Sequence, residues 1–337
     1  MKVVKIFAIA FSMVLVNCAS KQESISKING VSLVASRDSL QKTQAMALKN
    51  IHTNTVALMP FGFLRSLEHP EVVYSDEKQW FGERKEGIAQ YARELNSLGM
   101  ECMLKPQIWV WDGKFTGDIK MKTEKDWKRL EDSYESFILF FAEVGESLNI
   151  KYFCIGTELH SFALERPAFF KELIVKIRQR YSGELTYAEN WDSYQKISFW
   201  GDLDFIGIDA YFPLSKVKTP SVAVLSDNWK TYKKQMKSLS ETFNKPILFT
   251  EYGYRSSDYA AKAPWEHHRS TTKANHTAQS NALEALYQTF WKEPWFAGGF
   301  LWKWFPDLNA GGLDDNRFTI QNKPALKVVA KYYSEDR

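Results

Sequence analysis

The stretch KPILFTEYGY, residues 245–254, decides the fold class of this chain. Its apolar run is too short for a helix and is typical of a parallel strand buried on both faces. The run ends on Glu251, and an unpaired charge at the end of a buried strand is costly. A second stretch, YFCIGTE at residues 152–158, follows the same pattern and ends on Glu158. Either glutamate alone could be a helix cap or a salt-bridge partner, but the two together predict paired carboxylates at one rim of a barrel.

Short apolar runs alternate with helical patterns from residue 28 to the end of the chain. The expected strands are 28–34, 55–59, 101–109, 152–158, 185–190, 205–211, 247–251 and 298–304. The expected helices are 39–50, 83–98, 123–148, 167–181, 222–243, 277–291 and 324–333. This alternation predicts an α/β fold, a (β/α)8 TIM barrel in a single domain. An open doubly wound sheet is disfavoured because no glycine-rich phosphate turn follows an early strand.

Alternation along each strand predicts which side chains share a face. Glu158 is expected on the face of Gly156 and Cys154, and Glu251 on the face of Phe249. Polar side chains from other strands are expected to collect on the inner face near the strand ends: Lys105, Gln107, Asp209 and Tyr211.

The two glutamates predict glycosidic bond cleavage. Strands four and seven lie nearly opposite each other in an eight-stranded barrel, so Glu158 and Glu251 could flank one bond. Carboxyl groups roughly 5–5.5 Å apart hydrolyse such a bond with retention of configuration. Tyr211 is a plausible hydrogen-bond donor to Glu251, which favours the ionised form there and leaves Glu158 as the acid.

The chain resembles glycoside hydrolase family 113, whose characterised members are β-mannanases, within the clan of retaining (β/α)8 glycosidases. The matching stretches run in order over nearly the whole chain: MLKP (103–106), FCIGTEL (153–159), DFIGIDAYFP (204–213), TEYGY (250–254) and GGFLW (298–302). The resemblance implies that Glu158 is the acid/base and Glu251 the nucleophile. Most clan members carry Asn directly before the acid/base, whereas this chain carries Thr157, as the family does.

Other residues at the expected rim are candidates for substrate binding. Trp302 is expected to floor the subsite at the cleaved bond, as the resemblance implies. Lys105, Gln107 and Asp209 could hydrogen-bond sugar hydroxyls, although Asp209 could instead be a structural partner of Lys105. Asn190 is the candidate contact of the sugar 2-hydroxyl, and Tyr211 lies at the same rim. Outer subsites could be lined by further tryptophans, each of which taken alone is better explained by packing: Trp80, Trp109, Trp111, Trp191 and Trp304.

The leading hypothesis is a retaining endo-β-1,4-mannanase acting on mannan, glucomannan or manno-oligosaccharides. An exo-acting β-mannosidase or another β-glycanase of the clan is left open, because subsite length depends on loop geometry. A glycan-binding lipoprotein without catalysis is disfavoured because both carboxylates are present. No cofactor is expected. No metal site is expected either, since the adjacent His267 and His268 lack convergent ligands.

The N-terminal residues predict export and anchoring. Lys2 and Lys5 precede an apolar run at 6–16 that is too short to span a bilayer, and it leads into Cys18. This pattern resembles a bacterial lipoprotein signal, in which the cysteine is lipidated; an ordinary secretory signal is the alternative, because Asn17 is unusual before such a cysteine. Residues 1–17 are expected to be the signal, 18–27 a polar tether and 28–337 the enzyme domain. A membrane-anchored location in the bacterial cell envelope follows.

Composition and charge exclude other classes of function. The 337 residues are 45% apolar and 15% aromatic, which suffices for one large core. The formal charge of +4 is spread along the chain without a basic block, so no nucleic-acid partner is expected. Cys102 and Cys154 fall in expected strands, where cysteine behaves as a small apolar residue. A monomer is expected.

Overall fold

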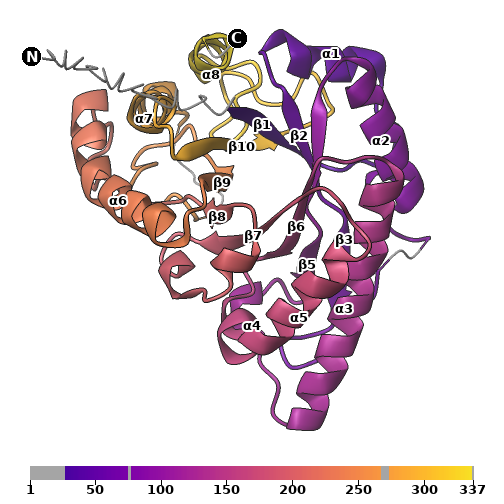
Figure 1. The fold of residues 1–337 in the computed structure, drawn as a ribbon. Coiled ribbons are helices and arrows are strands. Elements are labelled where there is room, and N and C mark those ends of the chain that lie inside the picture. The colour runs from indigo at the N-terminus through magenta and orange to yellow at the C-terminus, as the bar shows by residue number, and fades with distance from the viewer. Residues whose placement is uncertain (1–26, 75–76, 267–272, 336–337) are drawn as a thin grey trace, which may run out of the picture.

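The computed structural model describes residues 27–74, 77–266 and 273–335. Within them, eight parallel strands close a barrel, and each lies beside the next barrel strand in chain order (Figure 1). The barrel strands are β1 (Ile28–Leu33), β2 (Thr55–Leu58), β4 (Glu101–Leu104), β6 (Tyr152–Thr157), β7 (Glu184–Asn190), β8 (Ile206–Asp209), β9 (Ile247–Tyr252) and β10 (Phe296–Trp304). The predicted (β/α)8 barrel is confirmed.

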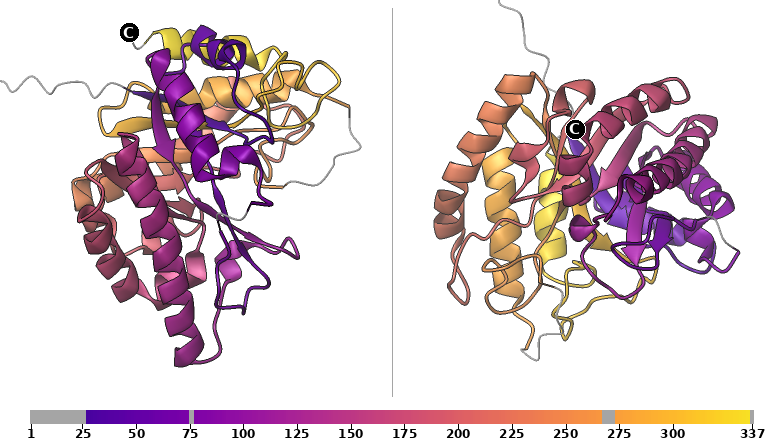
Figure 2. Two further views of the ribbon diagram at one scale, coloured as in Figure 1. Left: turned by 90° about the vertical axis from the view of Figure 1, so that its right-hand side faces the viewer. Right: turned by 90° about the horizontal axis from the view of Figure 1, so that it is seen from below.

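Helices cover the outside of the barrel wall (Figures 1 and 2). They are α1 (Lys42–Asn50), α2 (Lys85–Ser97), α3 (Glu124–Ser147), α4 (His160–Glu165), α5 (Pro167–Arg178), α6 (Val222–Phe243), α7 (His276–Phe290) and α8 (Ala325–Ser334). Single 3₁₀ turns lie at Phe81–Glu83, Thr116–Asp118, Tyr194–Lys196 and Trp200–Asp202.

The ends of α6 fall where the sequence predicts them. The side chain of Ser221 accepts a hydrogen bond from the N–H of Val224, which caps the first turn. Asn244 adopts the left-handed conformation that ends a helix, with a φ of 51°. The short helix α4 is not predicted, and it begins two residues after Glu158.

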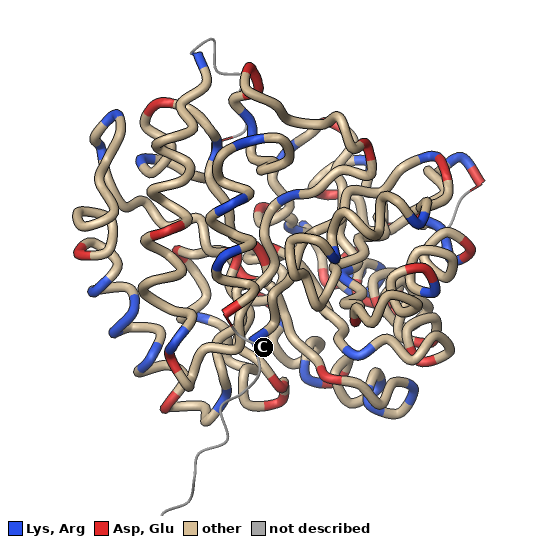
Figure 3. The backbone as a smooth tube through the Cα atoms, turned by 90° about the horizontal axis from the view of Figure 1, so that it is seen from above, with Lys and Arg blue, Asp and Glu red and all other residues tan. Residues whose placement is uncertain are grey.

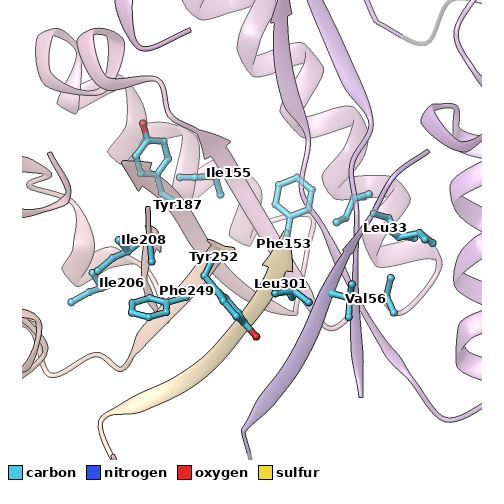
Figure 4. Close-up of a cluster of buried hydrophobic side chains, with 14 of the residues drawn as sticks. Leu33, Val56, Phe153, Ile155, Tyr187, Ile206, Ile208, Phe249, Tyr252 and Leu301 are labelled. Carbon is cyan, nitrogen blue, oxygen red and sulfur yellow. The ribbon is translucent and has the colours of Figure 1, made fainter. Parts of the chain in front are cut away.

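Two hydrophobic layers lie on the two faces of the barrel wall. The larger layer fills the space between the wall and the helices, and Figure 4 shows part of it, including Phe153, Ile206 and Phe249. A smaller cluster fills the inside of the barrel: Ile28, Ala57, Met103, Tyr152, Cys154, Ala188, Phe205, Leu248, Ala297 and Phe300. The barrel is therefore a packed core, and a ligand must approach from the ends of the strands.

A two-stranded parallel ribbon leaves the barrel at the ends of β2 and β4. The strand predicted at 101–109 divides at Pro106, and the part beyond it is β5 (Gln107–Val110). β5 pairs with β3 (Phe61–Leu64), which follows Pro60 in a segment expected to be loop. Proline has no N–H to donate to a strand ladder, which explains a break at each of these positions.

The predicted signal, most of the predicted tether and Cys18 lie outside the described residues. Lys27, at the end of the predicted tether, is buried, and its Nζ donates to the carbonyl oxygen of Glu293 at 2.7 Å and to that of Phe296. None of the described helices is both long and apolar enough to cross a bilayer. Cys102 and Cys154 are buried and form no disulfide. Acidic and basic residues are interspersed over the outer helices and loops (Figure 3).

Candidate active site

Glu251 reaches the inside of the barrel through an irregularity in β9. Against β8, Ile208 pairs with Phe249 whereas Asp209 pairs with Glu251, so the ladder passes over Thr250. Phe249 packs outside the wall under the helices (Figure 4). The expectation that Glu251 shares a face with Phe249 is wrong, because one extra residue in a strand breaks the alternation of side chains.

β6 carries a second irregularity just before Glu158. Its register against β7 shifts by one residue between Cys154 and Thr157. Cys154 lies in the cluster inside the barrel, whereas a side chain on Gly156 would point outward, 2.7 Å from the hydroxyl of Tyr134. The expected common face of Cys154 and Gly156 is therefore wrong. Glu158 follows the shift with a φ of 50°, at the mouth of the barrel.

Three donors surround the carboxylate of Glu251. Lys105 Nζ lies 2.5 Å and Gln107 Nε2 3.2 Å from its Oε1. The hydroxyl of Tyr211 donates to its Oε2 at 2.9 Å, as the sequence predicts. Burial, followed by the charge of Glu251, raises the pKa of Tyr211 well above its usual value, so this hydroxyl keeps its proton. Hydrogen bonds donated to a carboxylate stabilise its ionised form.

Lys105 is also paired with Asp209, which is the geometry of the structural role considered for Asp209. Lys105 Nζ lies 3.4 Å from Asp209 Oδ1, which accepts a second hydrogen bond from the hydroxyl of Thr250 at 2.7 Å. Burial and the charge of Glu251 raise the pKa of Asp209 to about 7, against the lowering effect of Lys105. Burial alone would lower the pKa of Lys105, but the charges of Asp209 and Glu251 outweigh it and raise that pKa. The lysine therefore stays charged.

Glu158 lies in a different environment. Burial contributes most to raising its pKa well above the usual range, followed by the charges of Asp209 and Glu251; Lys105 opposes them. The charge of Glu251 thus acts directly on Glu158, although the two residues come from β9 and from the end of β6. One carboxyl has a raised pKa and the other accepts hydrogen bonds from three donors, which matches the division of roles between an acid and a nucleophile.

Sequence reasoning missed Glu189, a fully buried carboxylate on β7. Its Oε1 accepts from the hydroxyl of Ser193 at 2.7 Å and its Oε2 from that of Tyr187 at 3.1 Å. The Nδ1 of His160 lies 3.8 Å away. The charge of Glu189 adds to the rise in the pKa of Glu158. The sequence did contain a signal for this residue: Glu189 is a glutamate inside a predicted strand, directly before the candidate Asn190.

Asn190 and Trp191 lie at the mouth, where the sequence places them. Asn190 pairs with Asp209 in the ladder between β7 and β8, and its Oδ1 accepts from the N–H of Trp191 at 2.9 Å. The indole of Trp191 stacks on Trp265, with ring centroids 5.2 Å apart, and meets the edge of Phe212. One face of Trp191 is therefore already occupied by another ring.

The tryptophans differ in exposure. Trp302 is half-buried late on β10, and the ammonium of Lys303 lies 4.9 Å from the centre of its ring. Trp304 is 3% exposed and packs in the core, so its packing interpretation is confirmed and its role in an outer subsite is wrong. The tryptophans of the described residues that are exposed to solvent are Trp80, Trp109, Trp111 and Trp265.

His267 and His268 lie outside the described residues. In the parts of the chain that the structure does describe, no group of three or more His, Cys, Asp or Glu side chains is placed to hold a metal ion.

Comparisons with known proteins point to one family. Residues 33–323 match the family model of Glycoside Hydrolase Family 113. The GH113 β-mannanase AaManA from Alicyclobacillus acidocaldarius, solved in complex with ManMIm, is 25% identical with a TM-score of 0.82, over 93% of this chain and 98% of that one. A structure described as a GH113 β-1,4-mannanase is 20% identical with a TM-score of 0.78, over 92% of this chain and 99% of that one. The comparison with curated proteins gives no match.

A more distant likeness concerns the fold alone. A β-glucuronidase from Ruminococcus gnavus is 14% identical with a TM-score of 0.55, over 87% of this chain and 46% of that one.

Proposed function

The chain belongs to glycoside hydrolase family 113, and from that premise we propose that it cleaves β-1,4-mannosidic bonds in mannan, glucomannan or manno-oligosaccharides with retention. The substrate class rests on the β-mannanases that share its fold over more than nine-tenths of both chains. The observation that carries the mechanism is the pair of unlike carboxyl groups, a protonated Glu158 and a Glu251 held by three donors.

In the first step, Glu251 attacks the anomeric carbon while Glu158 gives its proton to the leaving oxygen. The glycosidic bond breaks, and a covalent glycosyl–enzyme ester forms at Glu251. In the second step, Glu158, now ionised, takes a proton from water as the water attacks the same carbon. Glu251 leaves as a carboxylate, and both groups return to their starting states.

Neighbouring residues prepare Glu251 for this cycle. Lys105 supplies a buried positive charge that offsets the negative charge when the ester breaks. Gln107 and Tyr211 fix the orientation of the two carboxylate oxygens. Because each donates to Glu251, their contact with a sugar hydroxyl would be an additional role.

Asn190 is the proposed contact of the sugar 2-hydroxyl. Thr157, in the position where most clan members carry Asn, has its hydroxyl 4.0 Å from Cys154 Sγ inside the barrel. The Oδ1 of Asn190 is engaged with a backbone N–H, which leaves its Nδ2 as the group that can donate to substrate. Trp302 is proposed as the floor under the sugar at the cleaved bond.

Product analysis tests this proposal. Mannohexaose, cellohexaose and xylohexaose are incubated with the enzyme, and ¹H NMR follows the anomer that is released first. We expect cleavage of mannohexaose to mannobiose and mannotriose, with the β-anomer appearing first. Glu251→Gln keeps the shape of the side chain and a polar contact to Lys105, so its loss of turnover would report the nucleophile rather than the fold. Initial release of the α-anomer would contradict retention, and mannose as the sole product would indicate an exo enzyme.

A further inference from the structure

The ribbon of β3 and β5 has one buried face. Alternate residues of the two strands point into the protein: Gly62, Leu64, Ile108 and Val110. A side chain on Gly62 would collide with Val72 and lie 3.1 Å from the ring of Phe137 on α3. This face therefore packs tightly against the helical layer.

The opposite face of the ribbon is open and mostly aromatic. The strand register sets Phe61 beside Gln107 and Phe63 beside Trp109, so these four side chains share that face. Trp109 is 53% exposed. Trp111 continues the row, since its N–H donates to the carbonyl oxygen of Leu64 at 3.0 Å, and it is 62% exposed. These five residues are called the open strip: Phe61, Phe63, Gln107, Trp109 and Trp111.

The open strip begins at the nucleophile. Gln107 Nε2 lies 3.2 Å from the Oε1 of Glu251. Trp109 follows roughly 7 Å further along the strand, as two residues of extended chain require, and Trp111 lies just beyond the end of β5. The strip therefore leads from the reacting bond to a distance longer than one sugar ring.

The chemistry of the strip suits a neutral sugar chain. Flat aromatic rings pack against the C–H faces of pyranose rings, and the sugar hydroxyls can then stay in water. None of the five side chains is charged, so the strip offers nothing to a charged polymer. Contiguous exposed aromatic surface is unusual on a protein unless it binds something.

We propose that the open strip binds the sugar units of a β-mannan that lie beyond those at the cleaved bond. The inference rests on the proposed mannanase function and specifies which part of the mouth selects long chains. It makes the enzyme prefer polymers and long oligosaccharides over short ones.

Substrates of different length test the strip. Trp109→Ala is expected to lower the ratio of kcat/KM on mannohexaose to kcat/KM on an aryl β-mannobioside by roughly tenfold, since stacking on one ring is worth about that factor. Trp109→Phe keeps a flat ring and should retain most of the ratio, whereas Trp109→Leu keeps only the apolar character and should not. Val175→Ala, at an exposed position on α5, is the control and should leave both rates unchanged.

Two results would overturn the inference. Equal losses on the two substrates would place Trp109 in support of the catalytic carboxylate instead of the distal sugars. An unchanged ratio in both Trp109→Ala and Trp111→Ala would show that the strip binds no sugar.

Binding separates failure of the strip from failure of the proposed function. If the wild type cleaves no β-mannoside, the mannanase assignment fails. Glycan binding by the strip is then tested by electrophoresis in native gels that contain mannan, glucomannan or a soluble cellulose derivative. Trp109→Ala must migrate faster than the wild type in a gel whose glycan retards the wild type. If none of these glycans retards the wild type, the inference fails as well.

Discussion

Two glutamates at the mouth of this barrel differ in their immediate contacts. Glu251 accepts hydrogen bonds from Lys105, Gln107 and Tyr211. Glu158 is buried and lies near the negative charges of Asp209 and Glu251. Both effects raise its pKa. The charge of Glu251 contributes part of this rise, so loss of Glu251 should lower the pKa of Glu158.

The proton on Glu158 leads to the first prediction. Glu158→Ala should lower kcat/KM on mannohexaose by about 10²–10⁴-fold, because a positioned general acid contributes about that much. The loss should be far smaller on a dinitrophenyl β-mannobioside, whose leaving group needs no proton. Kinetics with both substrates check this, and Glu158→Gln should behave in the same way. Equal losses on the two substrates, in a variant with a native circular dichroism spectrum, would assign Glu158 another role.

Asp209 leads to a prediction on stability and pH. Its pKa is raised to about 7 in the folded protein, above the value near 4 expected when unfolded. Between those two pH values the folded protein therefore binds one more proton than the unfolded protein. The stability that this proton contributes is lost as the pH rises through about 7. Relative to Asp209→Asn, the wild type should lose up to about 1.4 kcal/mol of unfolding free energy per pH unit in that window.

Urea unfolding of both proteins between pH 4 and pH 8 measures this difference. Asp132→Asn removes an exposed carboxylate on α3 and is the matched control, with no comparable change expected. A wild type that gains stability over Asp209→Asn as pH rises would show that Asp209 is ionised throughout.

At the residue scale, the sequence was enough to predict side-chain contacts that follow from strand order. It missed contacts that depend on the exact positions of side chains. The contact of Tyr211 with Glu251 was predictable, since their strands are neighbours. The contact of Lys105 with Glu251 crosses the barrel and depends on the length of a lysine side chain. Glu189 was missed because its partners, including Ser193, become visible only when the turn after β7 is built.

At the scale of elements, the strands and helices were predictable because their apolar patterns are long and regular. The bulges before Glu158 and Glu251 were not, because an extra residue leaves no mark in an apolar run. Alternation therefore put the nucleophile on the same face as Phe249, which is wrong, although its strand and its place at the rim were right. The β3–β5 ribbon was missed for a related reason: Pro60 and Pro106 divide runs that read as one strand or as loop.

Closure of the barrel gives a prediction at this scale. Gly298 lies where β10 meets β1, with a φ of 113°, and a Cβ there would be 2.3 Å from the carbonyl oxygen of Ile28. Gly298→Ala combines a strained backbone with a collision that the packed seam cannot relieve. It should lower the free energy of unfolding by roughly 2–4 kcal/mol.

A second glycine separates strain from collision. Gly113 has a φ of 73°, but a Cβ there would meet nothing within 4 Å. Gly113→Ala should therefore cost only about 1 kcal/mol, from the backbone alone. Urea unfolding of the two variants gives both numbers. Equal costs would show that the seam between β1 and β10 can open to admit a methyl group.

At the scale of the whole molecule, the site depends on barrel closure. Residues from β9, from the ends of β4, β6 and β8, and from β5 meet at one mouth. The order of strands in the sequence was enough to predict that meeting, because a closed parallel barrel brings every carboxyl end to the same rim.

The last prediction concerns the anchor that we propose at Cys18, which stays a prediction from sequence. Acyl chains on this cysteine would hold the protein on a membrane, since each buried CH₂ contributes about 0.8 kcal/mol. Cys18→Ala should move the protein from the membrane fraction to the soluble fraction, and Ser20→Ala, two residues away, should not. Turnover of mannohexaose per molecule should be the same in both variants, because the three donors to Glu251 come from the ends of barrel strands and from β5. Membrane retention of Cys18→Ala would exclude lipidation there, whereas its release with lost activity would mean that the catalytic barrel needs the membrane.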